Sequence, residues 1–538
     1  MAKSLSLDNA QIANALERYA SLLDLAGSGY YTVRAYRRAA ALIRALPTPV
    51  ERLVREGKVR TLRGIGSGIG SVLAELVETG EVERFRDLEG EVEPELVGLG
   101  RFLGLGPKRA VELGRALGVR TADELRDAIS EGRLASVPGV GPKTEAKLRA
   151  ALERERQPRP PRGLLLNRAR ELAAAIAEPL GGVAAGDPRR WADVSNRFAV
   201  VSTDATALDR FAELPQIVSV VERDEHRALG VTVEGVPVEV VVAEPSRFGT
   251  ELVRATGSPE FVASLGGLPD APDEESLFRA LGRQYVPPEL REGAVGDVPR
   301  LVQLEEIRGD LHVHTSWSDG KATVLEMARA ACERGYEYLA ICDHTRNVRV
   351  VPGLDADDVR RQAEEIAAAN ASVAPFRVLA GIECDILPDG TLDLPDDVLA
   401  ELDWVQASVH AGQRAPRETI TKRVVEALRH PSVSCLSHPK GRIINHRPEN
   451  DLDLERVFEV ALEEGKAVEV NGLPDRLDLR DAHVRLAVEA GVPIVCSTDA
   501  HSTLGLGNMV LAVATARRGG ATATDVLNTR PLSDLPRR

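Results

Sequence analysis

The rear part of the chain alternates short apolar runs with amphipathic stretches. The runs have the length of strands and each ends in a polar residue that can bind a metal; they cover residues 338–342, 378–382, 405–409, 433–437 and 492–498. Helical patterns such as Val324 to Glu333 and Arg480 to Ala490 separate them. This repetition of strand, ligand and helix predicts a β/α barrel whose site lies at the carboxyl ends of the strands.

The stretch from Gly309 to Gly320 opens this series. Side chains alternate faces along a strand, so we expect His312 and His314 to point the same way, with Asp319 following on the loop. A lone pair of this kind is more often two ordinary polar residues, but here six of the ten histidines and three carboxylates fall at such positions. The sequence therefore predicts a metal centre. Its candidate ligands are His312, His314, Asp319, His344, Glu383, His410, His438, Asp499 and His501.

Between residues 163 and 300 the pattern is mixed α/β. We predict helices and strands in alternation, over 164–180, 198–202, 205–213 and 217–222, and then a hairpin over 228–233 and 236–242. Helical pieces follow to about Gly282. A charged, proline-rich stretch, 154–163, separates this region from the front of the chain and is typical of a linker.

From residue 1 to 155 the pattern is helical, and a glycine-containing turn recurs three times between predicted helices. Its glycines let backbone amides approach a phosphate at the N-terminus of the next helix. One such turn is usually just a tight helix connection, whereas three favour non-specific binding of the DNA backbone. The candidate DNA-binding residues are Gly64, Gly66, Gly68, Gly104, Gly106, Lys108, Gly139, Gly141 and Lys143. The basic stretch Tyr30 to Arg38 either adds a second contact or forms a solvated helix face.

The charge of the chain is unevenly distributed. A formal net charge of −14 over 538 residues taken alone disfavours nucleic-acid binding. Residues 1–163, however, carry 27 basic and 22 acidic side chains, whereas the remainder carries 41 and 60. A mildly basic front and an acidic rear fit DNA contact followed by metal chemistry.

Several features predict a cytoplasmic protein without a membrane partner. No apolar stretch reaches the roughly 20 residues that a membrane helix needs, and the N-terminus lacks an apolar signal core. The five cysteines show no C-x-x-C spacing, which predicts reduced, buried thiols. They are Cys332, Cys342, Cys384, Cys435 and Cys496.

The motifs at the predicted strand ends resemble those of the PHP (polymerase and histidinol phosphatase) phosphoesterases, over residues 308 to about 525. They read H-x-H, Ser-Asp-Gly, Asp-His, Gly-Ile-Glu, Ser-Val-His, Ser-His-Pro and Thr-Asp-Ala-His. The resemblance implies a distorted seven-stranded barrel that holds three divalent metals, Mn or Zn. One metal would take His312, His314, Glu383 and Asp499; a second Glu383, His410 and His438; the third Asp319, His344 and His501. No side chain would act as nucleophile, because a metal-bound hydroxide would attack the phosphorus.

Two arginines beside these motifs are candidates for phosphate binding. Arg442 lies in Ser-His-Pro-Lys-Gly-Arg and Arg476 follows Asn471. For each of them an ordinary surface arginine is the alternative interpretation.

The order of the regions resembles the family X DNA polymerases of the bacterial and archaeal type, which carry a C-terminal PHP domain. Local phrases support this: Arg34 to Ala40, the second and third glycine turns, Ala185 to Arg190, Arg247 to Leu252, Ala255 to Ser258, and Tyr285 to Gly293. The resemblance implies a multidomain protein. An all-α helix-hairpin-helix region would span 1–155, an α/β nucleotidyltransferase-like palm and thumb 163–300, and a distorted (β/α)7 PHP barrel 308–538.

The polymerase carboxylates that this resemblance leads us to expect are absent. Nucleotidyl transfer by two metals needs carboxylates at i and i+2 of one strand and a third from a neighbouring strand. On the family pattern these positions hold Arg197, Ala199 and Glu239, and the family's Gly-Ser becomes Gly186-Asp187. We predict that the palm folds, binds no Mg²⁺ and does not polymerise.

The sequence as a whole predicts a DNA-binding, metal-dependent phosphodiesterase, a 3′→5′ exonuclease or 3′-end processing enzyme of DNA repair acting at 3′ ends or gaps. A gap-filling polymerase is one alternative, and it would need Asp193 or Asp204 to replace the lost carboxylates. A phosphomonoesterase like histidinol phosphatase would have no use for the glycine turns, and an inactive DNA-binding scaffold would not need nine metal ligands. Lyase activity would need an early lysine, and neither Lys3 nor Lys58 stands out.

Overall fold

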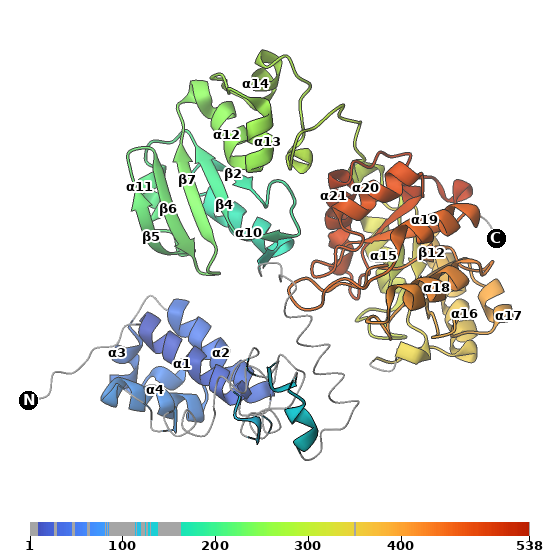
Figure 1. Cartoon of the computed structure of the whole chain (residues 1–538), viewed down its shortest axis with the longest axis horizontal. Coiled ribbons are helices and arrows are strands. Elements are labelled where there is room, and N and C mark those ends of the chain that lie inside the picture. Colours follow the sequence, from blue (N-terminus) through green and yellow to red (C-terminus); the bar gives the residue numbers. More distant parts are fainter. Residues whose placement is uncertain are drawn as a thin grey trace, which may run out of the picture. The chain divides into compact units, whose positions relative to one another are not determined.

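The computed structural model describes residues 9–25, 30–45, 49–61, 65–80, 82, 84–85, 113, 116–119, 124, 127–129, 131–137, 163–348 and 351–536 (Figure 1). The chain divides into two compact units, Met1–Pro160 and Pro161–Arg538. This division falls within the stretch 154–163, where the sequence predicts a linker. None of the described helices is long and apolar enough to cross a membrane.

The described part of the first unit is helical. Its main helices are α1 (Asn9–Leu25), α2 (Tyr30–Ala45), α3 (Val50–Arg55) and α4 (Ser67–Thr79). Apolar residues at helical spacing, such as Ile12, Leu16 and Ile43, are fully buried in one core that these helices share. Tyr36 faces the same core and packs edge-on against Tyr19, so this aromatic of the basic stretch serves packing. The all-α prediction is confirmed for these residues.

The second unit begins with a mixed five-stranded sheet in the order β2-β4-β7-β6-β5. The strands are β2 (Gly182–Gly186), β4 (Phe198–Ser202), β5 (Ile217–Arg223), β6 (Arg227–Thr232) and β7 (Pro237–Val242). β4 and β7 run parallel, and the other neighbours run antiparallel. The sequence predicted all of them except β2, which contains a single β-branched residue. A two-residue ladder joins β1 (Leu164–Leu165) to β3 (Val194–Ser195).

Helices cover both faces of this sheet (Figure 1). On one face, α10 (Leu166–Ala177) and α11 (Ala207–Phe211) bury Ile176 and Phe211 against strand residues such as Val200. On the other face, α12 (Phe248–Thr256) packs against the neighbouring Val201, as alternation along a strand requires. α12 also packs against α13 (Pro259–Leu265) and α14 (Glu274–Ala280), and these three helices share a small apolar cluster.

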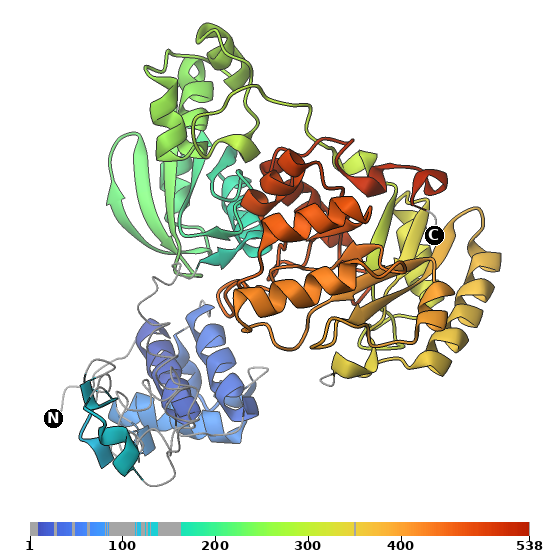
Figure 2. The same ribbon diagram turned by 45° about the vertical axis from the view of Figure 1, so that its right-hand side comes forward.

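The rest of the second unit is a parallel seven-stranded sheet in which spatial order follows sequence order from β8 to β14. The strands are β8 (Gly309–Val313), β9 (Tyr338–Ile341), β10 (Arg377–Asp385), β11 (Trp404–Ser408), β12 (Cys435–Leu436), β13 (Ala467–Asn471) and β14 (Ile494–Ser497). The helices are α15 (Val324–Glu333), α16 (Ala356–Val373), α17 (Asp396–Ala400), α18 (Arg417–Leu428), α19 (Leu454–Glu463), α20 (Asp481–Ala490) and α21 (Met509–Arg518), packed around the strands (Figure 2).

The sheet closes into a barrel. Val313 at the end of β8 forms a parallel bridge with Ala500, and the Asp499 amide donates to the His312 carbonyl at 2.9 Å. Every strand contributes at least one buried residue to a single interior cluster that includes Leu311, Trp404 and Cys435. The predicted β/α barrel is confirmed, but the sequence reasoning located only six of its strands and missed β13.

All five cysteines are free thiols. Cys342, Cys384, Cys435 and Cys496 are buried, as predicted, whereas Cys332 is exposed. The prediction of burial was wrong for Cys332, because it lies near the end of α15 on the face that solvent reaches.

Candidate metal centre

The nine predicted ligands form one connected cluster at the carboxyl ends of the barrel strands. Each of six strands supplies at least one, directly or from the loop that follows it, because all the parallel strands end on the same side. Only β13 supplies none. Residues that are up to 189 positions apart, His312 and His501, thus meet in one place.

His312 and His314 lie at the end of β8. Their Nε2 atoms are 3.2 Å apart, and His314 Nε2 is 2.9 Å from Asp499 Oδ1. All three side chains are buried. Two ring nitrogens and a carboxylate oxygen at this spacing are a typical ligand set for a cation.

Glu383, at the end of β10, occupies the centre of the cluster. Its Oε1 lies 2.8 Å from His438 Nε2 and 3.3 Å from His410 Nε2. Its Oε2 lies 2.7 Å from His344 Nδ1 and 3.6 Å from His312 Nε2. The same Oε2 is also 3.8 Å from His314 Nε2. One buried carboxylate therefore reaches five imidazoles, as a ligand shared between metals would.

Asp319 and His501 are the most exposed members of the cluster, and the buried His344 lies beside Asp319. Asp319 Oδ2 lies 3.3 Å from His501 Nε2, and Asp319 Oδ1 lies 3.7 Å from His344 Nε2 and 3.9 Å from His314 Nδ1. His314 and His344 each present both ring nitrogens to other cluster members. These two histidines thus connect ligand sets that the family resemblance assigns to separate metals.

The cluster shifts the pKa of its own members. Burial alone would raise the pKa of Asp319, but the hydrogen bond and the charge of His501 hold it at about 2. Burial would lower the pKa of His501, but Asp319 raises it to about 9. The pKa of His410 is also raised to about 9, because the charge of Glu383 outweighs burial. The histidines must therefore release protons when a cation binds.

Glu469 is a buried carboxylate of the site that sequence reasoning missed. Its Oε1 lies 2.7 Å from His312 Nδ1, and its Oε2 accepts hydrogen bonds from the His438 amide at 2.7 Å and Ser437 Oγ at 2.9 Å. Because Glu469 occupies Nδ1, the Nε2 atom of His312 is left to face the cluster. The available signal was an acid in the apolar run 467–471.

Two further buried carboxylates support the ligand loops. Asp343 accepts hydrogen bonds from the Thr315 amide at 2.8 Å and from Gln362 Nε2 at 2.6 Å. Asp385 accepts one from the His410 amide at 3.1 Å. These contacts fix the backbone that carries the ligands rather than adding ligands.

The two predicted phosphate-binding arginines lie in different surroundings. Arg476 Nε is 3.8 Å from Asp499 Oδ2, at the edge of the cluster. Arg442 instead points away from the cluster, where Nη1 pairs with Asp193 Oδ2 at 2.7 Å and Nε donates to the Arg476 carbonyl at 2.7 Å. Most of the hydrogen-bonding capacity of Arg442 is thus used within the protein.

The cluster fits divalent metals. Its imidazole and carboxylate donors suit Zn²⁺ or Mn²⁺, and the buried Nδ1 of His314 has no hydrogen-bond partner. Ligand atoms lie within 4.8 Å of one another in three overlapping groups. These are His314, Asp319, His344 and His501; His312, His314 and Asp499; and His344, Glu383 and His410.

Only the first glycine turn falls largely within the described residues. Gly66 caps the N-terminus of α4, and its carbonyl accepts a hydrogen bond from the Gly70 amide at 2.8 Å. Gly66 and Gly68 are exposed, and a side chain at either would meet nothing within 4 Å. The start of α4 is therefore open to a ligand. The other predicted DNA-binding residues, Gly64, Gly104, Gly106, Lys108, Gly139, Gly141 and Lys143, lie outside the described residues.

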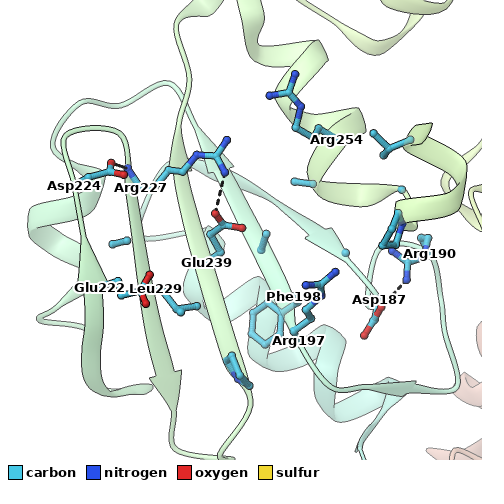
Figure 3. A pocket seen from close by; sticks show the side chains of 18 of the residues that line it. Asp187, Arg190, Arg197, Phe198, Glu222, Asp224, Arg227, Leu229, Glu239 and Arg254 are labelled. Carbon is cyan, nitrogen blue, oxygen red and sulfur yellow. Dashed lines mark hydrogen bonds and ion pairs between the residues drawn. The ribbon is translucent and has the colours of Figure 1, made fainter. Parts of the chain in front are cut away.

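The palm has a cavity of about 770 Å³ over β4, β6 and β7 (Figure 3). Arg197, Ala199 and Glu239 all line it, and Ala199 lies beside Glu239 on the parallel strands β4 and β7. Glu239 pairs with Arg227 at 3.1 Å. The three positions of the absent polymerase carboxylates thus lie together and leave a single acid, which an arginine neutralises.

Three other acids of the palm pair with arginines. Asp187 pairs with Arg190 at 2.6 Å, Asp193 pairs with Arg442 and Asp204 pairs with Arg210. Neither Asp193 nor Asp204 lines the cavity. Among the described residues, every group of side chains spaced to hold a metal lies in the barrel.

The sequence matches known families along much of its length. Residues 7–82 match a helix-hairpin-helix domain, 99–154 a SAM-like helix-hairpin-helix tandem, and 310–472 the PHP domain. The chain is 35% identical to the DNA polymerase/3′-5′ exonuclease PolX of Bacillus subtilis (strain 168), over 97% of this chain and 98% of that protein. The chain belongs to the PolX family.

Other relatives share only the rear of this PolX-family chain. A probable phosphatase of Acetivibrio thermocellus is 33% identical over 37% of this chain and 81% of its own length. A probable phosphatase of Thermoanaerobacter sp. (strain X514) is 30% identical over 41% and 89%. The PHP domain is a metal-dependent phosphoesterase domain, and the helix-hairpin-helix regions of this family bind DNA. The protein is therefore a DNA-binding, metal-dependent phosphoesterase.

Proposed function

We propose that this protein is a 3′→5′ exonuclease that trims DNA ends during repair, with the barrel as its active site and a palm that does not polymerise. The cluster of nine ligands around Glu383, six of them buried, carries the proposal. The family relationship supports it, because the Bacillus relative is named for both a polymerase and a 3′-5′ exonuclease.

The cluster has enough donors for three cations. We assign His312, His314, Glu383 and Asp499 to one; Glu383, His410 and His438 to another; and Asp319, His344 and His501 to the third, with Mn²⁺ or Zn²⁺ as the metal. Bound cations of this kind polarise a phosphodiester and acidify a coordinated water. The chain's own part is to orient imidazoles, as Glu469 does for His312.

Arg476 is the residue that we propose to hold the DNA phosphate. Its guanidinium lies at the edge of the cluster and makes no hydrogen bond within the described residues. An arginine whose side chain is held only by a long ion pair can bind a phosphate oxygen without first breaking a hydrogen bond. Arg442 lacks this freedom, because it is engaged with Asp193 and two carbonyls.

The front of the chain would hold the DNA duplex through backbone phosphates. The exposed glycines at the start of α4 support such contacts, and contacts to the backbone do not depend on base sequence. We expect 3′ ends and gaps to be the preferred substrates, and the cytoplasm to be the site of action.

The residues that line the palm cavity do not favour polymerisation. Metal-dependent nucleotidyl transfer needs clustered carboxylates, and the cavity has Arg197 and Ala199 where two of them would stand. The charge of Arg197 would repel a cation there. Mg²⁺ is therefore not expected to bind the palm.

The test is an assay on primer-template DNA labelled at the 3′ or the 5′ end, with Mn²⁺, in the presence and absence of dNTPs. We expect shortening from the 3′ end and no extension. The His312→Ala/His314→Ala variant should lack the shortening, because two cluster ligands are gone, while keeping DNA binding.

Two results would overturn the proposal. Primer extension that persists in His312→Ala/His314→Ala would show that the palm polymerises. Hydrolysis of small phosphomonoesters without any action on DNA would show an enzyme closer to the probable phosphatases.

A further inference from the structure

The loop between β13 and α20 lies between the metal cluster and the palm. At its start, Asn471 Nδ2 donates to Asp499 Oδ2 at 2.9 Å. Arg476 comes within 3.8 Å of the same carboxylate oxygen. The next residue, Leu477, is fully buried in an apolar cluster with Leu166 of α10 and Leu511 of α21. One short segment thus contacts a ligand at one end and the palm at the other.

Arg442 holds this loop by its backbone. Its Nε donates to the Arg476 carbonyl at 2.7 Å and its Nη2 donates to the Leu477 carbonyl. These are the carbonyls of Arg476 itself and of the residue that follows it. The position of the Arg442 guanidinium therefore sets where Arg476 enters the site.

Asp193 of the palm in turn holds Arg442. Its Oδ2 is 2.7 Å from Arg442 Nη1, and its Oδ1 is buried without a hydrogen-bond partner. Burial would lower the pKa of Arg442, but the charge of Asp193 outweighs it and raises the pKa. The pair is a charge-assisted contact between the palm and the barrel.

The palm segment that carries Asp193 is itself fixed. Arg190 Nη1 donates to the Thr256 carbonyl at 2.5 Å and Nη2 to Asp187 at 2.6 Å. The Trp191 ring lies 3.4 Å below the Arg170 guanidinium. From the barrel, Arg518 Nη1 donates to the Arg190 carbonyl at 2.6 Å. Asp193 therefore acts on Arg442 from a rigid support.

We propose that Asp193 is a positioning residue for the barrel site, acting through Arg442 to place Arg476 beside the metal cluster. This inference rests on the proposed function, in which Arg476 binds the phosphate of the DNA. In this view the palm segment 186–193, where the sequence resembles the triphosphate site of a polymerase, serves as a brace for the nuclease.

The test compares Asp193→Asn, Arg476→Ala and the double variant as full-length, Mn²⁺-loaded proteins on 3′-labelled DNA. Asp193→Asn keeps the shape of the side chain and removes its charge. We expect each single variant to lower kcat/KM by about tenfold or more, as for residues in one contact network. In the double variant, Asp193→Asn should add nothing to the loss caused by Arg476→Ala.

A matched control separates positioning from stability. Glu289 pairs with Arg517 at 2.7 Å, also between the 163–300 region and the barrel, and the pair is about as buried as Asp193 and Arg442. It does not touch the 471–480 loop. Glu289→Gln should lower Tm as Asp193→Asn does, but leave kcat/KM unchanged.

Hydrogen exchange of backbone amides is a second test, and it does not depend on nuclease activity. In metal-free protein, Asp193→Asn should speed exchange in residues 472–480, and Glu289→Gln should not. If the wild type does not cut DNA, the proposed function fails, and this measurement still decides whether Asp193 holds the loop. Unchanged exchange, or losses of Asp193→Asn and Arg476→Ala that simply add, would overturn the inference.

Discussion

The barrel and the palm both direct side chains from parallel strands into a polar site, and they differ in what those side chains can bind. In the barrel, Glu383 alone contacts five imidazoles. In the palm, the equivalent central acid, Glu239, contacts Arg227. Val200 and Val240 remain fully buried beneath the palm cavity, so the sheet persists without its metal ligands. The fold of a domain is thus weaker grounds for its chemistry than the residues of its site.

The sharpest test of this contrast changes one central acid in each region. Glu383→Gln removes the shared negative charge among the histidines, so we expect nuclease activity to fall to background and elemental analysis to show fewer bound metals. Glu239→Gln removes the acid of the palm and should leave both quantities unchanged. Equal losses from the two variants would show that the palm takes part in catalysis.

A smaller effect is expected from Glu469→Gln. Glu469 binds the Nδ1 of His312 at 2.7 Å and contacts no metal position directly. Loss of such a supporting carboxylate typically costs about 10- to 100-fold in metal affinity or activity. Titration with Mn²⁺ and measurement of kcat/KM would check this, and wild-type values for both would contradict the assigned role.

Glu469 is also an example of a site residue that the sequence alone did not predict. Six strands could be located because each ends in a histidine or carboxylate within a specific motif. β13 ends in Asn471-Gly472, so the same search passed over it and over its inward-facing acid. A ligand motif reveals a strand by its chemistry, whereas a supporting residue is defined only by the partner that folding brings to it, here from 157 positions away.

Arg442 shows that a local motif does not determine the contacts of a side chain. Its place in Ser-His-Pro-Lys-Gly-Arg, four residues after His438, predicted phosphate contact. The structure turns its guanidinium towards Asp193, a palm residue that lies just before β3. Which way a long side chain points depends on the surrounding elements, and those are not encoded in the local motif.

Rebuilding the palm carboxylates would test how much of that site has been lost. Arg197→Asp/Ala199→Asp, made in the His312→Ala/His314→Ala background to silence the barrel, would place two carboxylates beside Glu239. We expect weak Mg²⁺ binding by calorimetry that the background protein lacks, because three clustered acids attract a cation. We expect no primer extension, since Asp187 still lines the cavity, at the position that the family resemblance assigns to triphosphate docking. No Mg²⁺ binding would mean that Arg227 keeps Glu239 unavailable.

The smallest expected effect is on the pH dependence of the stability of the metal-free protein, to which the barrel contributes and the palm does not. Burial would lower the pKa of His410 and His501, but neighbouring carboxylates raise both to about 9. Their protonated forms therefore stabilise the fold fully below about pH 6.5, the unfolded value, and this contribution is lost as pH rises through 9. The palm's buried Glu274, whose pKa the nearby Arg189 and Arg291 lower to about 2 against the effect of burial, stays ionised throughout that window.

In EDTA, Tm should fall on the order of 5 °C between pH 6.5 and 9.5. His410→Gln/His501→Gln should flatten that slope, and a slope that survives in this variant would place the titrating groups elsewhere.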